Sequence, residues 1–137
     1  MLMGEIITAV AYSLPIKLVI IKNNTLGQIK WEQMVFQGNP EYQCDLFPID
    51  FVALAEAVGA KGVRIEDPRT AGAKFDEALA MPGPVIIEAV VDQFTAMLPA
   101  KIKADQAIKF SEALAKGEPN RIRIALTAAK DTVRQIV

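Results

Sequence analysis

An apolar run that breaks off into amides and a glycine constrains the fold of this chain more than any other stretch. Residues 17–22 read KLVIIK, and residues 23–27 read NNTLG. Leu and β-branched residues without polar alternation are typical of a parallel strand that helices cover on both faces. Ligands of such sheets gather at the carboxyl ends of the strands, and a following helix can direct its free N–H groups at an anion. The turn is therefore a candidate site for a phosphorylated cofactor held through a hard metal ion, although Asn and Gly are also the commonest turn residues and a turn needs no ligand.

Composition excludes several other classes of function. The 137 residues carry 15 basic and 16 acidic side chains, a balance that leaves no electrostatic footprint for nucleic acid. The chain has no His and a single cysteine, Cys44, so it holds no His-based triad, thiolate metal cluster or disulfide framework of its own. Any metal must use oxygen ligands. The lone cysteine suits a reducing compartment, and we expect a cytoplasmic protein.

Hydrophobic periodicity predicts an α/β fold, with a parallel sheet and helices on both faces. We expect helices over residues 3–13, 27–36, 51–58 and 71–81, and strands over residues 18–22, 62–66 and 85–91. Asp50 and Thr70 are the expected N-caps of the third and fourth helices. Glu88, in the middle of the last strand, is expected to pair with a nearby group or to mark the frayed end of the strand rather than to act in catalysis. The residues expected in the core are Met3, Ile6, Ile7, Val10 and Leu14 in the first helix, and Ala71, Phe75, Ala78 and Leu79 in the fourth.

The composition changes after residue 97 and predicts a C-terminal helical arm instead of more sheet. We expect residues 1–97 to form the sheet region, and residues 98–137 to extend the same domain with helices over 104–116 and 121–136. No apolar run reaches the roughly eighteen residues that a membrane span needs. The last helix has an apolar stripe, which we expect to pack on its own protein because it lacks the bulky residues of an interfacial helix. That stripe consists of Ile122, Leu126, Ala129, Val133 and Ile136.

The first third of the chain resembles a known family. Residues 3–10 read MGEIITAV, residues 14–17 read LPIK and residues 23–33 read NNTLGQIKWEQ. In this order they resemble the cofactor-diphosphate domain of the thiamine-diphosphate enzymes of the pyruvate oxidase and acetolactate synthase group. The family's Gly-Asp-Gly motif is missing, and by register it would lie just upstream of Met1. The resemblance therefore implies the thiamine-diphosphate-binding fold in an N-terminally truncated form.

The resemblance also assigns site residues. Asn23 falls on the Asn that binds Mg²⁺ in the family, whereas Lys22 stands where the family usually has a first Asn. Thr25 falls where a backbone carbonyl reaches the metal. The positions assigned to the cofactor are Asn23, Thr25, Leu26, Gly27 and Ile29, and those assigned to substrate-side chemistry are Glu32 and, with a weaker case, Gln28. For Glu32, a solvated helix-surface carboxylate is the alternative.

The implied activity is decarboxylation of a 2-oxo acid such as pyruvate, for which thiamine diphosphate supplies the nucleophile and electron sink. The carboxylate ligand of Mg²⁺ and the glutamate that activates the cofactor would come from outside this chain. A second copy or a partner chain would thus supply the pyrimidine-binding domain, and the 137-residue chain alone would be inactive.

Residues 99–103 read PAKIK and are followed by Gln106, Ala107 and Phe110. This part of the arm resembles the C-terminal extension of the pyruvate oxidase and quinone-linked pyruvate dehydrogenase branch, which favours an oxidative reaction, with FAD on a domain outside this chain. An acetolactate synthase or another 2-oxo acid decarboxylase is one alternative. A non-catalytic split subunit or fragment is the other. Membrane binding is not expected, and Cys44, in the irregular loop over residues 37–45, is expected to be inert.

Overall fold

A computed structural model describes the backbone of residues 3–95 and 103–136, with side chains up to residue 130. The chain divides into two compact units, which we describe separately. Unit 1 combines Met1–Asn23 with Pro48–Val91, and unit 2 combines Asn24–Phe47 with Asp92–Val137. The first helix after the candidate turn belongs to the same unit as the C-terminal arm.

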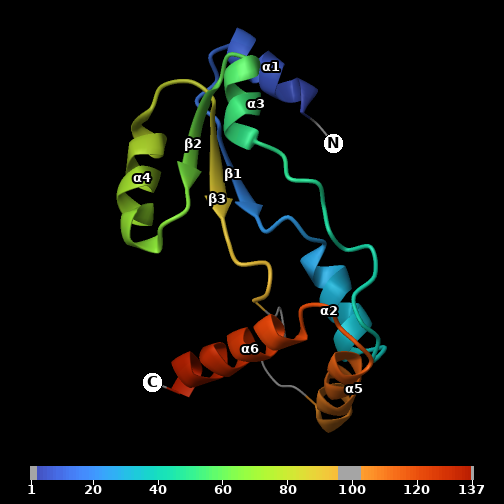
Figure 1. Cartoon of the computed structure of the whole chain (residues 1–137). Coiled ribbons are helices and arrows are strands. Elements are labelled where there is room, and N and C mark those ends of the chain that lie inside the picture. The colour runs from blue at the N-terminus through green and yellow to red at the C-terminus, as the bar shows by residue number, and fades with distance from the viewer. Residues whose placement is uncertain (1–2, 96–102, 137) are drawn as a thin grey trace. The chain divides into compact units, whose positions relative to one another are not determined.

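Unit 1 is built on a parallel three-stranded sheet (Figure 1). Its strands are β1 (Lys17–Lys22), β2 (Lys61–Ile65) and β3 (Val85–Val90), in the order β1-β3-β2. Its helices are α1 (Gly4–Ala11), α3 (Phe51–Ala57) and α4 (Pro68–Ala80). The expected order of helices and strands and the parallel sheet are confirmed.

Helices cover both faces of this sheet (Figure 1). On one face α4 contributes Ala78 to a core that contains Ile65, Val85 and Ile87. Helices α1 and α3 cover the opposite face, where the core comprises Ala55, Ala60 and Ile86 with Ile6 and Val10 packed against them. The alternation of Val85, Ile86 and Ile87 between the two cores follows from the two-residue period of a strand. The two-sided cover inferred from the apolar runs is therefore confirmed for the central strand.

Burial at the edge of the sheet is weaker than the sequence predicts. In the described part of the chain β1 is an edge strand, and its Ile21 is 64% exposed. The apolar stripe expected around α1 is only partly buried. Ile6 and Val10 pack against the core, whereas Met3, Ile7 and Leu14 are exposed. These residues were expected in the core because a sequence pattern gives the spacing of a stripe but not the extent of the surface that covers it.

The two predicted N-caps have different outcomes. Asp50 caps α3, and its Oδ1 accepts a hydrogen bond from the N–H of Ala53 at 2.9 Å. Thr70 does not cap α4, because the helix starts two residues earlier at Pro68 with Asp67 as the cap. An Asp followed by Pro at the first helical position is a strong start signal, and it outweighs a Thr one turn later. The inward side of α4 is also narrower than expected, because Ala71 and Ala78 contact the core whereas Phe75 and Leu79 are exposed.

Unit 2 contains α2 (Gly27–Val35), α5 (Ala104–Ala115) and α6 (Arg121–Ile136). All three helices match the expected ones within two residues. Their core consists of Trp31, Met34, Phe94, Ala113 and Ile124. The Trp31 ring also meets Phe110 of α5 at a centroid distance of 6.3 Å. The C-terminal arm is thus packed on the helix that follows the candidate turn.

The apolar stripe of α6 does not pack as expected. Ile122 and Leu126 are 70% and 58% exposed, and Ala129 is exposed as well. Ile124, outside that stripe, is fully buried, and it is the buried residue among the side chains of α6 described up to residue 130. The side chains of Val133 and Ile136 lie outside the described residues. None of the helices described here is long and apolar enough to cross a membrane.

Candidate functional site

The carboxyl end of β1 is anchored to β3 up to its last residue. Lys22 pairs with Val90 in the sheet, and its carbonyl accepts a hydrogen bond from the N–H of Val91 at 3.0 Å. Asn23, the expected metal ligand, follows directly and is the last residue of this segment of unit 1. The sequence-predicted ligand therefore sits at the carboxyl end of a parallel strand, where ligands of such sheets gather.

The turn after β1 is held by the irregular loop over residues 37–45. Thr25 and Asp45 form an antiparallel bridge: the N–H of Leu26 donates to the Cys44 carbonyl at 2.8 Å, and the N–H of Leu46 donates to the Asn24 carbonyl at 2.9 Å. The Thr25 hydroxyl donates to the same Cys44 carbonyl at 3.1 Å. Asn24 adopts a φ of 54°, a left-handed conformation that Asn tolerates better than most residues. The backbone at Cys44, which the sequence does not single out, thus fixes the turn.

No side chain of the cap residue or acidic residue of the first turn compensates the free N–H groups at the N-terminus of α2. Its cap residue Leu26 makes no side-chain capping bond, and the first turn carries no acidic residue. The N–H groups of Gly27, Gln28 and Ile29 have no acceptor within the helix, because the first N–H groups of any helix lack one. Together with the helix dipole they favour an anion.

The expected cofactor contacts in this turn differ in their backbone bonding. The N–H of Leu26 donates to the Cys44 carbonyl, whereas the N–H groups of Gly27 and Ile29 have no acceptor within α2. The assignment of Leu26, Gly27 and Ile29 to the cofactor stays a prediction.

The two residues expected on the substrate side are brought together. The Gln28 side-chain amide donates to Glu32 Oε1 at 3.0 Å, one helical turn apart on α2. Both side chains are exposed. The contact orients Glu32 but leaves its second oxygen for other partners, so the catalytic assignment of both residues stays a prediction.

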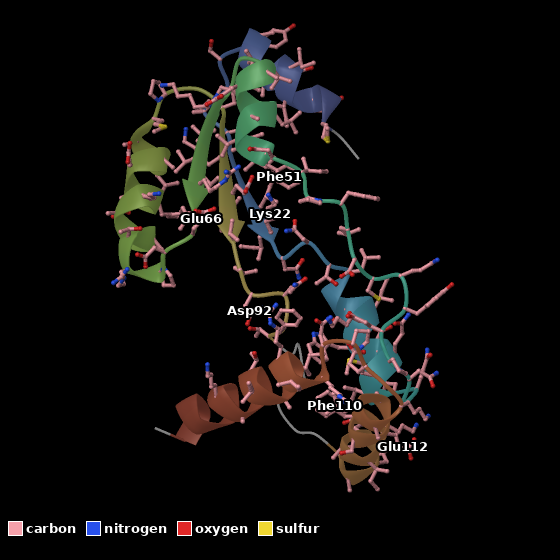
Figure 2. All side chains as sticks on the ribbon, in the orientation of Figure 1. Lys22, Phe51, Glu66, Asp92, Phe110 and Glu112 are labelled. Atoms are coloured by element: carbon pink, nitrogen blue, oxygen red, sulfur yellow. The ribbon has the colours of Figure 1, made fainter. Side chains whose placement is uncertain are left out.

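Lys22, the residue that departs from the family pattern, belongs to a charge network in unit 1. Its ammonium lies 3.0 Å from Oε1 of Glu88, a side chain with no exposed surface. The Nε of Arg64 donates to the same oxygen at 3.0 Å. Glu88 Oε2 accepts the N–H of Phe51 at 2.8 Å, and Arg64 also pairs with Asp50. Figure 2 shows Lys22 and Phe51 close together, with the ammonium 6.0 Å from the ring centroid. Glu88 thus pairs with neighbouring groups, as predicted.

Two titratable groups near these elements have shifted pKa values. Burial raises the pKa of Glu88, but the hydrogen bonds from Lys22 and Phe51 and the charge of Arg64 outweigh burial, so its pKa lies below the ordinary value. Burial raises the pKa of the Cys44 thiol, and the nearby charge of Glu41 acts in the same direction. A buried thiol with a raised pKa is a poor nucleophile, which agrees with the expectation that Cys44 is inert.

The donors present in the turn suit a magnesium ion. Asn23 and Thr25 offer an amide and a carbonyl oxygen, which are ligands that Mg²⁺ accepts. The turn itself contains no carboxylate. Across the side chains that the structure describes, no three His, Cys, Asp or Glu residues lie close enough to share a metal ion. The residues present can hold part of a coordination shell and no more.

Comparison with known proteins gives the family. Residues 1–89 match the family described as thiamine pyrophosphate enzyme, C-terminal TPP binding domain. Among solved structures, a thiamine diphosphate-dependent 4-hydroxybenzoylformate decarboxylase of Rhodococcus jostii matches with a TM-score of 0.60 and 27% identity. That match covers 66% of this chain and 17% of the decarboxylase. The α/β fold inferred from the apolar strands is thereby confirmed.

Two curated relatives are similar to most of this chain. A protein of Bacillus subtilis named for its thiamine pyrophosphate, YdaP, is 34% identical over 136 residues, which is 99% of this chain and 23% of YdaP. The mitochondrial acetolactate synthase catalytic subunit of Saccharomyces cerevisiae is 33% identical over 100 residues, which is 72% of this chain and 14% of the synthase. The chain thus spans less than a quarter of either relative. It belongs to the thiamine pyrophosphate enzymes and carries their C-terminal cofactor-binding domain.

Proposed function

We propose that this chain supplies the diphosphate-binding part of a thiamine-diphosphate- and Mg²⁺-dependent enzyme that decarboxylates a 2-oxo acid such as pyruvate by an oxidative reaction. The observation that carries the proposal is the turn from a parallel strand into α2, whose N-terminus has no side-chain cap and no acidic residue. Such a helix start is suited to a diphosphate. It lies within residues 1–89, the part that matches the family.

The chain's own residues have distinct roles in this proposal. The Asn23 side chain and the Thr25 carbonyl bind the metal, and the N–H groups of Gly27 and Ile29 contact the diphosphate. Gln28 and Glu32 face the substrate. The bound thiamine diphosphate supplies the nucleophile and electron sink for decarboxylation.

The remaining parts of the site come from elsewhere. The carboxylate ligand of Mg²⁺ and the pyrimidine-binding domain belong to a further segment, a second copy or a partner chain, and FAD would occupy a domain outside this chain. We call the protein that unites these parts the complete enzyme, and we propose that it is cytoplasmic and oligomeric.

The support for an oxidative reaction is the resemblance of the C-terminal arm to the extension of the pyruvate oxidase branch. The alignment with YdaP covers 99% of the chain and hence the arm, but the name of YdaP states no reaction. The alignments with the yeast synthase and with the Escherichia coli acetolactate synthase isozyme 3 large subunit cover 72% and 55% of the chain. An acetolactate synthase is the second candidate, favoured by the identity of 38% over the 76 residues shared with the E. coli subunit.

Product analysis of the complete enzyme tests the proposal. Incubation with pyruvate, thiamine diphosphate, Mg²⁺ and a two-electron acceptor should give CO₂ and acetate, with water supplying the new carboxylate oxygen and the acceptor taking up two electrons, and no acetolactate. The purified 137-residue chain is the control and should show no turnover. Formation of acetolactate would favour the second candidate. No decarboxylation of any 2-oxo acid would contradict the proposal and leave a non-catalytic subunit.

A further inference from the structure

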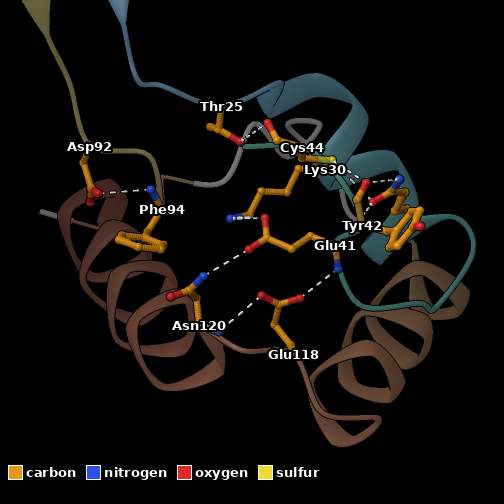
Figure 3. A network of polar contacts seen from close by, with 10 residues as sticks. Thr25, Lys30, Glu41, Tyr42, Cys44, Asp92, Phe94, Glu118 and Asn120 are labelled. Carbon is orange, nitrogen blue, oxygen red and sulfur yellow. Dashed lines mark hydrogen bonds and ion pairs between the residues drawn. The ribbon is translucent and has the colours of Figure 1, made fainter. Parts of the chain in front are cut away.

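Lys30 is the least exposed lysine of unit 2 among the residues described, and on α2 it directly follows the proposed diphosphate contacts at Gly27 to Ile29. Its side chain is 1% exposed, and its ammonium lies 5.3 Å from the ring centroid of Phe94 and 5.9 Å from that of Trp31. A buried ammonium is costly unless a carboxylate compensates it. Oε2 of Glu41 lies 2.6 Å from the ammonium and provides that charge (Figure 3).

Glu41 is itself held by the turn between α5 and α6. Its N–H donates to Glu118 Oε2 at 2.9 Å, and its Oε1 accepts the side-chain amide of Asn120 at 3.0 Å. Glu118 is 2% exposed, and its other oxygen accepts the N–H of Asn120 at 3.3 Å. Figure 3 shows these groups as one connected set between the loop, α2 and the arm. The arm therefore fixes the carboxylate that neutralises Lys30.

The loop around Glu41 rests on α5 as well. The ammonium groups of Lys109 and Lys116 donate to the carbonyls of Phe36 and Gly38, each at 2.8 Å. Gly38 has a φ of +67°, and a Cβ placed there would lie 3.1 Å from Glu112 Oε2 and 3.4 Å from the Lys109 carbonyl. The first half of the loop thus packs directly on the arm, while its second half, at Cys44, holds the turn that begins α2.

We propose that Glu118 and Asn120 are positioning residues for cofactor binding: through Glu41 and Lys30 they hold α2 and its turn where the N–H groups of Gly27 to Ile29 can receive the diphosphate. This inference rests on the proposed function and adds a role for the arm. The arm contacts neither metal nor substrate in this account; it acts through the loop over residues 37–45.

The test compares two glutamates of the arm in the complete enzyme. Glu118→Gln keeps the size of the side chain but leaves one oxygen where two N–H groups need an acceptor. Glu112→Gln is the matched control, because Glu112 is half-exposed, its ion pair with Lys116 at 3.7 Å is weak, and Gln keeps the volume of the side chain beside Gly38. Hydrogen exchange of the cofactor-free enzyme and the dissociation constant for thiamine diphosphate at saturating Mg²⁺ are measured for both variants.

We expect Glu118→Gln to accelerate amide exchange over residues 38–46 and to raise the dissociation constant, each by about tenfold. Glu112→Gln should change neither by more than about twofold. Should Glu118→Gln not fold, Asn120→Ser removes only the hydrogen bond to Glu41 while keeping a helix-capping side chain, and about a threefold rise in the dissociation constant is expected.

Two results would overturn the inference alone. One is equal cofactor affinity of the Glu118 and Glu112 variants, and the other is faster exchange in Glu118→Gln without weaker cofactor binding. A wild-type enzyme that does not bind thiamine diphosphate would instead overturn the proposed function, and this inference with it.

Discussion

The ammonium of Lys22, the last residue of β1, lies 3.0 Å from Oε1 of Glu88 on the neighbouring strand β3. The sequence predicts that Lys22 replaces an Asn of the family pattern, and the structure gives this lysine a carboxylate partner. Glu88 has no exposed surface and receives hydrogen bonds from Lys22, Arg64 and the N–H of Phe51. One buried carboxylate thus ties all three strands of unit 1 to the start of α3.

Neutralising Glu88 should destabilise the chain. In Glu88→Gln, Lys22 and Arg64 lose their shared buried partner, and because both are partly exposed we expect a loss of about 2 kcal/mol in the free energy of unfolding, below the full cost of an isolated buried charge. Urea denaturation of the purified chain, followed by circular dichroism, measures it. Glu66→Gln, at an exposed neighbouring position, is the control and should lie within about 0.5 kcal/mol of wild type. Equal stability of the two variants would contradict the role of Glu88.

The lowered pKa of Glu88 predicts how stability depends on pH. Because its folded pKa lies below the ordinary value of 4.5, the unfolded chain binds more protons between the two values, and stability falls as the pH drops through this window. The contribution is complete above the ordinary pKa and lost below the folded one. Asp50 and Asp67 also have lowered pKa values, set first by hydrogen bonds from Ala53 and Arg69, so some slope remains in any variant. Glu88→Gln should therefore flatten the decline of stability below about pH 4.5 without abolishing it. An identical slope in wild type and variant would show that Glu88 does not contribute.

Cys44 should be unreactive in the folded protein. Burial raises the pKa of its thiol and limits access, so we expect alkylation near neutral pH to be at least about 100-fold slower than in the urea-unfolded chain. The measurement is the rate of labelling by a thiol reagent, read by mass spectrometry. Stoichiometric labelling of the native protein at the rate of the unfolded chain would contradict the burial of this loop.

The exposed face of α6 is expected not to bind lipid. Ile122 and Leu126 project from the protein, but an interfacial helix usually adds Trp or Phe and a strongly basic polar face. Co-sedimentation of the complete enzyme with anionic vesicles should leave it in the supernatant. Binding that disappears in an Ile122→Asn, Leu126→Asn double variant, which leaves the buried Ile124 in place, would show that this face binds the membrane.

The sequence predicts local structure well where one strong signal dominates. The apolar runs over residues 18–22 and 85–91 locate two strands within one residue, and Asp50 caps its helix as expected. Prediction fails where two local signals compete, as when Asp67 and Pro68 start α4 ahead of Thr70. It also fails where burial depends on distant segments, as for Ile122 and Leu126 on an amphipathic helix whose buried residue proves to be Ile124.

The residues of the candidate site also differ in whether a local sequence signal reveals them. Asn23 and Gly27 are recognisable from a local motif, and the structure places them at the end of β1 and the start of α2. The groups that hold this turn, the Cys44 carbonyl and the chain from Lys30 through Glu41 to Glu118, are absent from any local pattern. Their partners lie up to 77 residues away in the sequence, and only the folded chain brings them together.

The affinity of the complete enzyme for thiamine diphosphate and Mg²⁺, measured by calorimetry in Asn23 and Asn24 variants, tests the central claim most directly. If the turn after β1 binds the metal-diphosphate, Asn23→Ala removes a ligand oxygen and should weaken binding by more than about 100-fold, beyond the effect typical of outer-shell changes. Asn24→Gly is the control: glycine accepts the φ of 54° at this position, so binding should stay within about threefold of wild type. Wild-type affinity in Asn23→Ala would contradict the account, and its loss in Asn24→Gly alone would move the metal ligand to Asn24.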